Sequence, residues 1–123
     1  MLRKEFEEYV RHTYGVEADY PFEDDLVSGV FRHPDSGRWF ALAMNIPRRK
    51  LGIDREGRVD VVNLKCPPEI IESLLGTEEG VYRAYHMNKT HWLTLALGEC
   101  DEATVAWFLN ISYDLTQRKK KAR

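Results

Sequence analysis

The stretch PDSGRWFALAMNI, residues 34–46, decides the fold of this chain. Its first four residues place proline and glycine where a β-turn accepts them. The next nine, Arg38 to Ile46, are mostly apolar, as expected for a central strand that is covered on at least one face. A shorter β-prone segment, Val27–His33, precedes the turn, so the two segments predict an antiparallel hairpin.

More β-prone segments follow on the C-terminal side. Lys50–Ile53 and Arg58–Leu64 flank Asp54-Arg55-Glu56-Gly57, which has the composition of a four-residue hairpin loop. Together with the first hairpin, these segments predict an antiparallel meander. Two further strands are expected at Val81–Tyr85 and Trp92–Leu97.

Three segments have helical spacing. The first is Leu2–Tyr14, followed by Gly15, and the second begins at Cys66-Pro67-Pro68-Glu69 and ends at Gly76. The third is Asp101–Gln117, with Asp101 as a candidate N-cap. Its predicted buried face is Val105, Phe108, Leu109, Ser112 and Leu115, widened by Trp107 and Ile111.

The predicted order of elements is therefore α-β-β-β-α-β-β-α. Strands with helices between and beside them indicate a two-layer α+β fold, with an antiparallel sheet of about five strands and helices packed on it. Repeats, low-complexity segments and linkers are absent from the sequence. We therefore expect a single domain over residues 1–123, with a basic tail at about 118–123.

Composition excludes several classes of protein. The chain has 123 residues, 43% of them hydrophobic, which suffices for one core. No apolar run approaches the roughly 20 residues that span a bilayer, and the N-terminus lacks the apolar region of a secretory signal. Cys66 and Cys100 are too few for a disulfide framework or a thiolate zinc site. We expect a cytoplasmic protein with free thiols and no association with membranes.

The net charge of −2 conceals an uneven distribution. Residues 1–25 sum to −5, residues 48–58 to +3, and residues 118–123 to +5. Such local basic patches suit a polyanion. The whole chain, however, lacks the basic isoelectric point that usually marks a dedicated nucleic-acid binder. Charge alone therefore leaves the partner open.

The common catalytic and cofactor motifs are absent: there is no dinucleotide-binding glycine motif, P-loop, nucleophile elbow, zinc-protease helix or C-x-x-C. We therefore expect that the protein is not an enzyme and binds no cofactor. His86 and His91 could hold a metal, but no third ligand is visible, so no metal site is predicted. Cys66 precedes a helix, whose dipole would lower its thiol pKa.

Residues 85–92, YHMNKTHW, combine two histidines, a lysine, an asparagine and two aromatic side chains. A cationic aromatic loop of this kind can stack on a base or bind a phosphate. The alternative is structural, because Asn88 tolerates turn geometry and Trp92 can anchor a strand. The residues favour the structural role: a loop ordered by its own hydrogen bonds, with Asn88 or His91 bonded to backbone and Trp92 largely buried.

The motif His86-Met87-Asn88-Lys89-x-His91-Trp92, followed by an apolar strand and then by Ser112-Tyr113-Asp114-Leu115, resembles the MmcQ/YjbR family of small bacterial proteins. Pro21-Phe22, Trp39-Phe40-Ala41-Leu42 and Leu64-Lys65-Cys66-Pro67-Pro68-Glu69 also match. The resemblance implies a two-layer fold like that of the type III secretion chaperones. It also implies DNA binding through a pair of wing-like β-hairpins, and it brings no catalytic residues.

Two functions follow as hypotheses. The first is nucleic-acid binding. Its main phosphate contacts would be Arg48, Arg49, Lys50, Arg55, Arg58 and the tail residues Lys119, Lys120 and Lys121. Lys89, His91 and Tyr85 would form a second contact with the nucleic acid. The alternative is a protein-interaction or chaperone-like module, which recruits a partner or a second copy through sheet aromatics. Those aromatics are Trp39, Tyr82, Tyr85 and Trp92. An apolar, contiguous free sheet face would favour the second hypothesis, and a polar, basic face the first.

Overall fold

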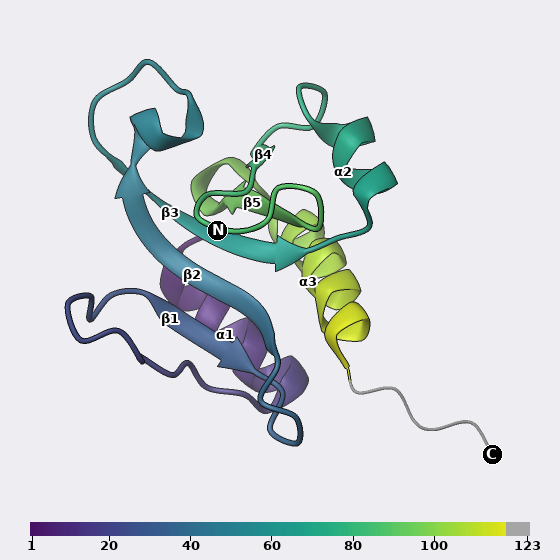
Figure 1. Cartoon of the computed structure of the whole chain (residues 1–123). Coiled ribbons are helices and arrows are strands. Elements are labelled where there is room, and N and C mark those ends of the chain that lie inside the picture. The colour runs from purple at the N-terminus through teal and green to yellow at the C-terminus, as the bar shows by residue number, and fades with distance from the viewer. Residues whose placement is uncertain (118–123) are drawn as a thin grey trace.

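A computed structural model describes residues 1–117 and contains one five-stranded antiparallel sheet with three α-helices (Figure 1). The element order confirms the predicted α-β-β-β-α-β-β-α arrangement and the α+β class. The helices are α1 (Arg3–Tyr14), α2 (Pro68–Leu74) and α3 (Glu102–Thr116). The strands are β1 (Gly29–Arg32), β2 (Trp39–Pro47), β3 (Arg58–Lys65), β4 (Val81–Arg83) and β5 (Trp92–Ala96).

The strands lie in the order β1-β2-β3-β5-β4, so β2, β3 and β5 are interior and β1 and β4 form the edges. β2 and β3 pair from Ala41–Leu64 to Pro47–Arg58. The edge formed by β1 carries an isolated bridge between Asp19 and Val30, which brings the segment after α1 beside it.

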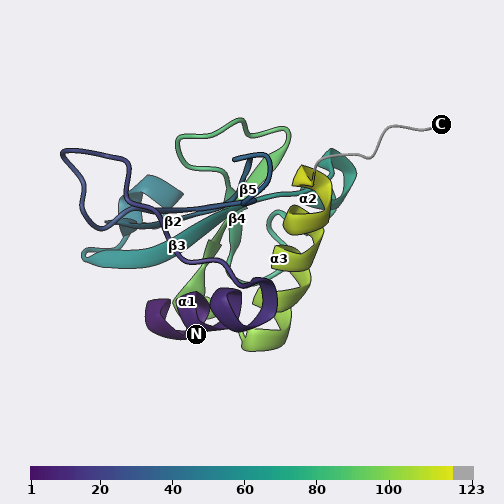
Figure 2. The same cartoon turned by 90° about the horizontal axis from the view of Figure 1, so that it is seen from below.

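The two faces of the sheet are covered differently. Figure 2 shows the sheet close to edge-on, with α1 and α3 on one side. The large core lies beneath these helices and includes Phe6, Phe31, Phe40, Leu64, Leu93, Leu95, Val105, Phe108 and Leu109. Loops cover the other face, which we call the loop face.

A β-bulge at Phe40 joins the sheet to α3. The register pairs Phe31 with Ala41 but Arg32 with Trp39, which leaves Phe40 as the extra residue. The buried Ser112 hydroxyl of α3 donates to the Phe40 carbonyl (2.6 Å) and accepts the Lys65 N–H (2.8 Å). One helical side chain therefore satisfies backbone groups of both β2 and β3, at the position of the serine in the late sequence motif.

The predicted strand at Lys50–Ile53 is wrong. Residues Arg48–Leu51 form a short 3₁₀ helix, η1, and β2 pairs directly with β3 as far as Pro47 and Arg58. Gly52 ends this turn in the left-handed conformation (φ 78°), which a β-branched residue would resist. The connection is therefore a ten-residue loop, 48–57, rather than a four-residue hairpin turn.

The predicted buried face of α3 is right at its centre and wrong at its margins. Val105, Phe108, Leu109 and Ser112 are buried, whereas Leu115 is 44% and Trp107 52% exposed. Thr116 is buried in the place expected for Leu115. Its hydroxyl lies 2.8 Å from Nε2 of the buried His33, so the two polar side chains satisfy each other in the core. Asp101 caps the helix as predicted, accepting the Thr104 N–H at 2.8 Å.

No helix within residues 1–117 is both long enough and apolar enough to cross a membrane. The basic tail at about 118–123, including Lys119, Lys120 and Lys121, lies outside the described residues.

Candidate functional site

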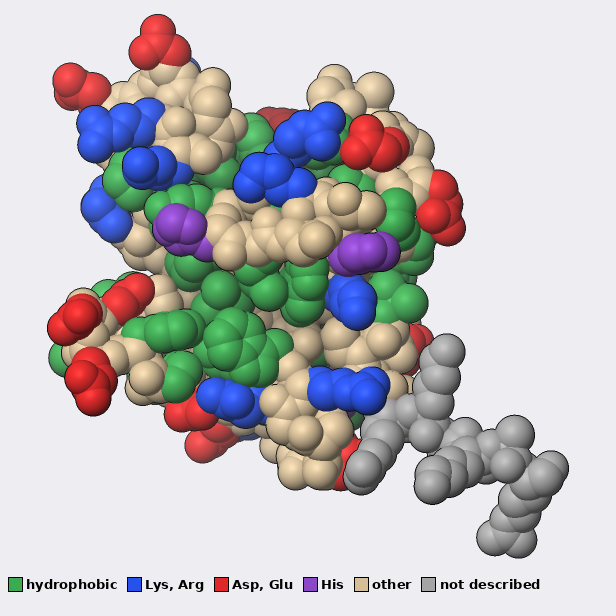
Figure 3. All heavy atoms as spheres, in the orientation of Figure 1, with side chains coloured by type: hydrophobic (Ala, Val, Ile, Leu, Met, Phe, Trp, Pro, Cys, Tyr) green, Lys and Arg blue, Asp and Glu red, His purple; other side chains and the backbone are tan. Residues whose placement is uncertain are grey.

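The loop face is apolar and contiguous. Figure 3 shows apolar side chains at its centre, with Lys, Arg and His side chains around them. Its buried residues are Val30, Leu42, Met44, Ile46, Val59, Val61 and Ala96. Phe22, Leu51, Tyr85 and Met87, from three different loops, pack against them. By the criterion set from the sequence, this composition favours an interaction surface over a phosphate-binding one, although the loops already cover much of it.

The four expected sheet aromatics do not form a bare patch. Trp39, Tyr82, Tyr85 and Trp92 are each only partly exposed. Trp39 packs edge-on against Phe22, with 6.2 Å between the ring centroids, and the Arg32 guanidinium lies 5.6 Å from its ring. The Tyr82 hydroxyl donates to Glu99 at 2.8 Å. Tyr85 lies against His86, with 3.9 Å between the ring centroids, so Trp39, Tyr82 and Tyr85 already have neighbours of their own.

The 84–91 loop is attached to the sheet by a buried polar network. The Asn63 amide donates to the Tyr85 carbonyl at 2.7 Å and accepts the Thr94 hydroxyl. Thr94 in turn accepts the Tyr85 N–H at 3.0 Å. Asn63 and Thr94 are fully buried, and the described residues leave no buried side-chain polar atom unsatisfied. Tyr85 is thus held through its backbone.

The tip of the loop is ordered by its own hydrogen bonds, as predicted. The Asn88 side chain accepts the N–H groups of Thr90 (2.9 Å) and His91 (3.0 Å). The Lys89 ammonium donates to the Ala84 carbonyl at 2.7 Å. Trp92 is only partly exposed, in agreement with the prediction that it is largely buried. The motif asparagine and lysine therefore have clear structural roles.

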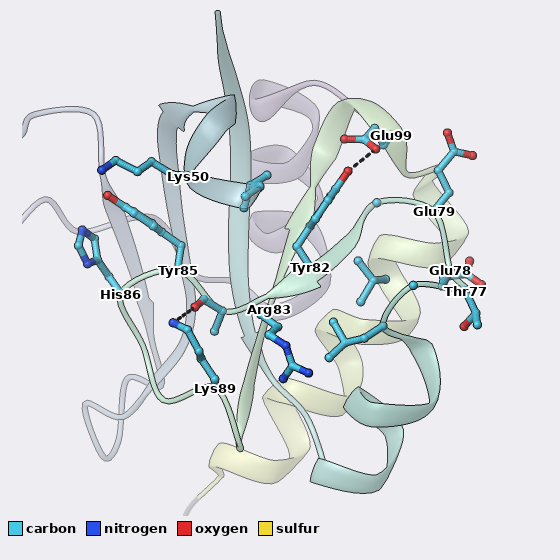
Figure 4. A pocket seen from close by; sticks show the side chains of 16 residues that line it. Lys50, Thr77, Glu78, Glu79, Tyr82, Arg83, Tyr85, His86, Lys89 and Glu99 are labelled. Carbon is cyan, nitrogen blue, oxygen red and sulfur yellow. Dashed lines mark hydrogen bonds between the residues drawn. The ribbon is translucent and has the colours of Figure 1, made fainter. Parts of the chain in front are cut away.

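A pocket of about 870 Å³ lies along β4, between η1, the turn over 75–80 and the 84–91 loop (Figure 4). Lys50, His86 and Lys89 stand at one end. Glu78, Glu79 and Glu99 stand at the other end. Tyr85 lies beside Lys50, and Tyr82 and Arg83 lie between the two groups. The pocket is therefore polarised along its length, with cations at one end and carboxylates at the other.

Strand β4 has a sheet neighbour, β5, on one side only within the described chain. The Gly80 carbonyl accepts the Ala96 N–H at 2.9 Å. In an antiparallel ladder, successive residues alternate in direction, so the peptide groups of Val81 and Arg83 point away from β5. The Val81 N–H donates to the Glu78 carbonyl at 3.4 Å, so the Arg83 N–H is the outward donor that an added strand would use. An open strand edge is a template for pairing with another extended chain.

The predicted phosphate-binding cations are divided between two places. Lys50 and Lys89 line the β4 pocket, whereas Arg49, Arg55 and Arg58 surround a separate hollow of about 480 Å³ that also contains Asp54 and Glu56. Arg48 and His91 line neither. The Arg58 guanidinium donates twice to Asn45, at 2.6 and 2.8 Å. Thirteen Lys and Arg against 20 Asp and Glu give residues 1–117 a net charge of −7.

The thiols are protonated and enclosed. Burial raises the pKa of Cys66 and of Cys100 to about 11. The predicted lowering of the Cys66 pKa is therefore wrong, because desolvation outweighs the helix dipole at a side chain that is 1% exposed. Within residues 1–117, no group of three or more His, Cys, Asp or Glu side chains is placed to hold a metal ion.

Sequence reasoning missed the buried network and the polarity of the pocket. Asn63 and Thr94 are the polar members of two otherwise apolar runs, VVNL and WLTLA. A lone polar residue pointing into a covered sheet face needs a partner, and this was the available signal. Glu99 had no such signal, because its neighbours Glu78 and Glu79 come from a distant turn.

The chain is similar to known proteins in family, in sequence and in fold. A family model described as YjbR matches residues 5–115. The uncharacterized protein YyaQ of Bacillus subtilis is 36% identical over 118 residues, covering 95% of this chain and 99% of YyaQ.

Solved structures agree with the fold. A crystal structure of a Pseudomonas syringae protein has a TM-score of 0.91 at 40% identity, covering 95% of this chain and all of the other. A solution structure from the same organism scores 0.88 at 38% identity, over 100% and 98% of the two chains. Protein DR2400 of Deinococcus radiodurans shares the fold at 24% identity and a TM-score of 0.65, over 94% and 81%.

Proposed function

The chain belongs to the YjbR family, and we propose that it is a protein-interaction module that binds an extended peptide along β4. One observation carries the proposal: the open edge of β4 lies in a pocket whose two ends have opposite charge. A peptide that adds a strand gains main-chain hydrogen bonds from the edge, while side-chain contacts provide selectivity.

The charges specify the peptide. Acidic side chains would lie near Lys50 and Lys89, and basic ones near Glu78, Glu79 and Glu99, with apolar residues over the two tyrosines. A short strand such as β4 offers few main-chain bonds, so charge order along the peptide should decide orientation. The proposal involves binding only, without catalysis or a cofactor, and we place it in the cytoplasm, where two free buried thiols are the usual state.

A backbone-amide NMR titration with a peptide of sequence EEVTVKK, beside the reversed sequence KKVTVEE, tests this. Because the two ends of the pocket have opposite charge, one of the two peptides should shift the backbone-amide resonances of residues 80–85. The peptide with the reversed charge order should shift them much more weakly. Arg83→Pro removes an outward N–H and should abolish binding, whereas the matched control Arg83→Ala keeps the N–H and should retain it. Equal binding by both variants would disprove strand addition.

Nucleic-acid binding is the second candidate, favoured by the convergence of Arg49, Arg55 and Arg58 on one hollow. Residues 1–117 carry a net negative charge, so phosphate contacts would be limited to local basic patches such as this one and the cationic end of the β4 pocket, together with the cations after Gln117. Binding would therefore be weak and would fall steeply with salt.

Titration of fluorescent single-stranded and duplex DNA over a salt series tests this second candidate. The double variant Arg49→Glu/Arg55→Glu should weaken binding and flatten the salt slope, while Lys4→Glu on α1 should change neither. If the intact chain binds no DNA at about 50 mM salt, where such contacts are strong, the nucleic-acid function is excluded.

A further inference from the structure

Strand β4 presents its outward main-chain groups unevenly. Tyr82 pairs with Thr94 of β5 inside the sheet, so the main-chain groups of Val81 and Arg83 point outward. The Val81 N–H already donates to the Glu78 carbonyl. Among the described residues of β4, Arg83 is therefore the one that can exchange two main-chain hydrogen bonds with a single residue of a ligand. Such a two-bond pair is the repeating unit of antiparallel pairing.

The side chains of β4 alternate between the two faces of the sheet. Val81 lies in the core beneath the helices, whereas Tyr82 packs on the loop face. Arg83 therefore points to the helix side, where its guanidinium lies 3.5 Å from the Glu72 carboxylate of α2. Both side chains of this ion pair are more than half exposed, so the pair contributes little to stability and leaves Arg83 available to a carboxylate of a ligand.

We infer that a peptide bound along β4 runs antiparallel to the strand, with an acidic residue opposite Arg83, and this inference rests on the proposed function. Residues directly opposite each other in an antiparallel pair have their side chains on the same face, so the acidic side chain lies beside the Arg83 guanidinium. The next two residues of the peptide lie opposite Tyr82 and Val81 and suit β-branched or apolar side chains. Those that follow reach the carboxylate end of the pocket and suit lysine or arginine. The partner is an extended segment whose acidic, apolar and basic residues follow in that order from its N-terminus.

The sheet and its charges favour this direction over the parallel one. The four strand pairs of the sheet are all antiparallel, and an antiparallel pair is slightly more stable per residue than a parallel one. Strand β4 begins at the carboxylate end of the pocket and runs toward Lys50 and Lys89 (Figure 4). A parallel peptide would need basic residues before acidic ones to match the same two ends. The charge order of the peptide that binds therefore reports its direction.

Peptide titrations with a nitroxide label test the direction. EEVTVKK should bind about tenfold more tightly than KKVTVEE. A label at the N-terminus of EEVTVKK should broaden the backbone-amide resonances near Lys89, and a label at its C-terminus should broaden those near Glu79. Tighter binding of KKVTVEE, or the opposite pattern of broadening, would overturn the antiparallel direction and leave strand addition in place. If neither peptide binds, the proposed function fails together with this inference.

A charge exchange tests which residue lies opposite Arg83. Arg83→Glu places two carboxylates opposite each other and should raise the dissociation constant of EEVTVKK about fivefold or more, beyond any effect of Arg83→Ala. The peptide EKVTVKK, with lysine at its second position, should restore binding to Arg83→Glu, whereas KEVTVKK, changed at its first position, should not. Lys4→Glu on α1 is the matched control and should leave the affinity for EEVTVKK unchanged. Equal restoration by the two altered peptides, or none by either, would refute the register.

Discussion

The two faces of the sheet are buried by different means. On the helix face, α1 and α3 cover β2 and β3 with regular, periodic apolar side chains such as Phe6, Val105 and Leu109. On the loop face, irregular segments supply single residues such as Phe22, Leu51 and Met87. Regular elements can bury a large contiguous core, whereas loops must satisfy their own backbone groups as well as cover the sheet. The helix face should therefore determine stability, and the loop face should determine where ligands gain access.

The largest effect is expected on the helix face. Phe108 is 2% exposed, and Phe108→Ala should lower the free energy of unfolding by about 3–5 kcal/mol, through lost burial and a residual cavity. Met87→Ala, at a half-buried loop-face position, should cost about 1 kcal/mol or less. Urea unfolding measures both values. Similar losses for the two variants would mean that the faces contribute equally.

The next effect concerns the polar network that attaches the loop face. Asn63→Ala leaves the Tyr85 carbonyl and the Thr94 hydroxyl without their partner in a buried site, at a cost of about 1–3 kcal/mol. Hydrogen exchange should accelerate at the amides of residues 84–91 more than at those of α3. Thr104→Ala is a control polar deletion outside this network. Uniform acceleration over the whole chain would show that the network supports the global fold instead of one loop.

The sequence predicted the helix face better than the loop face for a physical reason. Helical and strand periodicities report which residues are buried together, so the element order and most of the α3 face were correct. Residues such as Leu51 and Met87 belong to no periodic pattern, so the sequence does not reveal that they cover the sheet. Without that cover, the sheet aromatics are candidates for an exposed patch. The Lys50–Ile53 strand failed similarly, because a short β-prone run cannot reveal that β2 already pairs with β3 up to Pro47. Convergence of Lys50 with Glu99 on one pocket depends on tertiary folding alone.

A smaller effect should appear with pH, and it belongs to the helix face. His33 is 3% exposed beneath α3, and burial lowers its pKa below the ordinary value; Asp35 opposes this shift and Arg38 adds to it. The unfolded chain therefore takes up a proton that the folded chain resists. This contribution to stability is fully present above about pH 6.5 and is lost as the pH falls below it. Thermal melts between neutral and mildly acidic pH measure the change.

The variant His33→Gln should reduce the dependence of stability on pH in that window, although it costs stability at neutral pH. His91→Gln, at an exposed loop-face position, provides the matched control and should leave the dependence unchanged. A pH profile that His33→Gln does not alter would assign the effect to another group.

The smallest effect distinguishes two lysines at the same end of the β4 pocket. Lys89 donates to the Ala84 carbonyl, so Lys89→Met should lower stability by about 0.5–1.5 kcal/mol. Lys50 is an exposed residue of η1, and Lys50→Met should change stability by no more than about 0.5 kcal/mol. If acidic ligand groups bind at this end, both variants should weaken binding of the peptide. If Lys89 serves only to close its loop, Lys89→Met should reduce stability alone, and Lys50→Met should account for the whole loss of affinity. Paired unfolding and peptide titrations on the two variants therefore separate the structural role of the motif lysine from a role in binding.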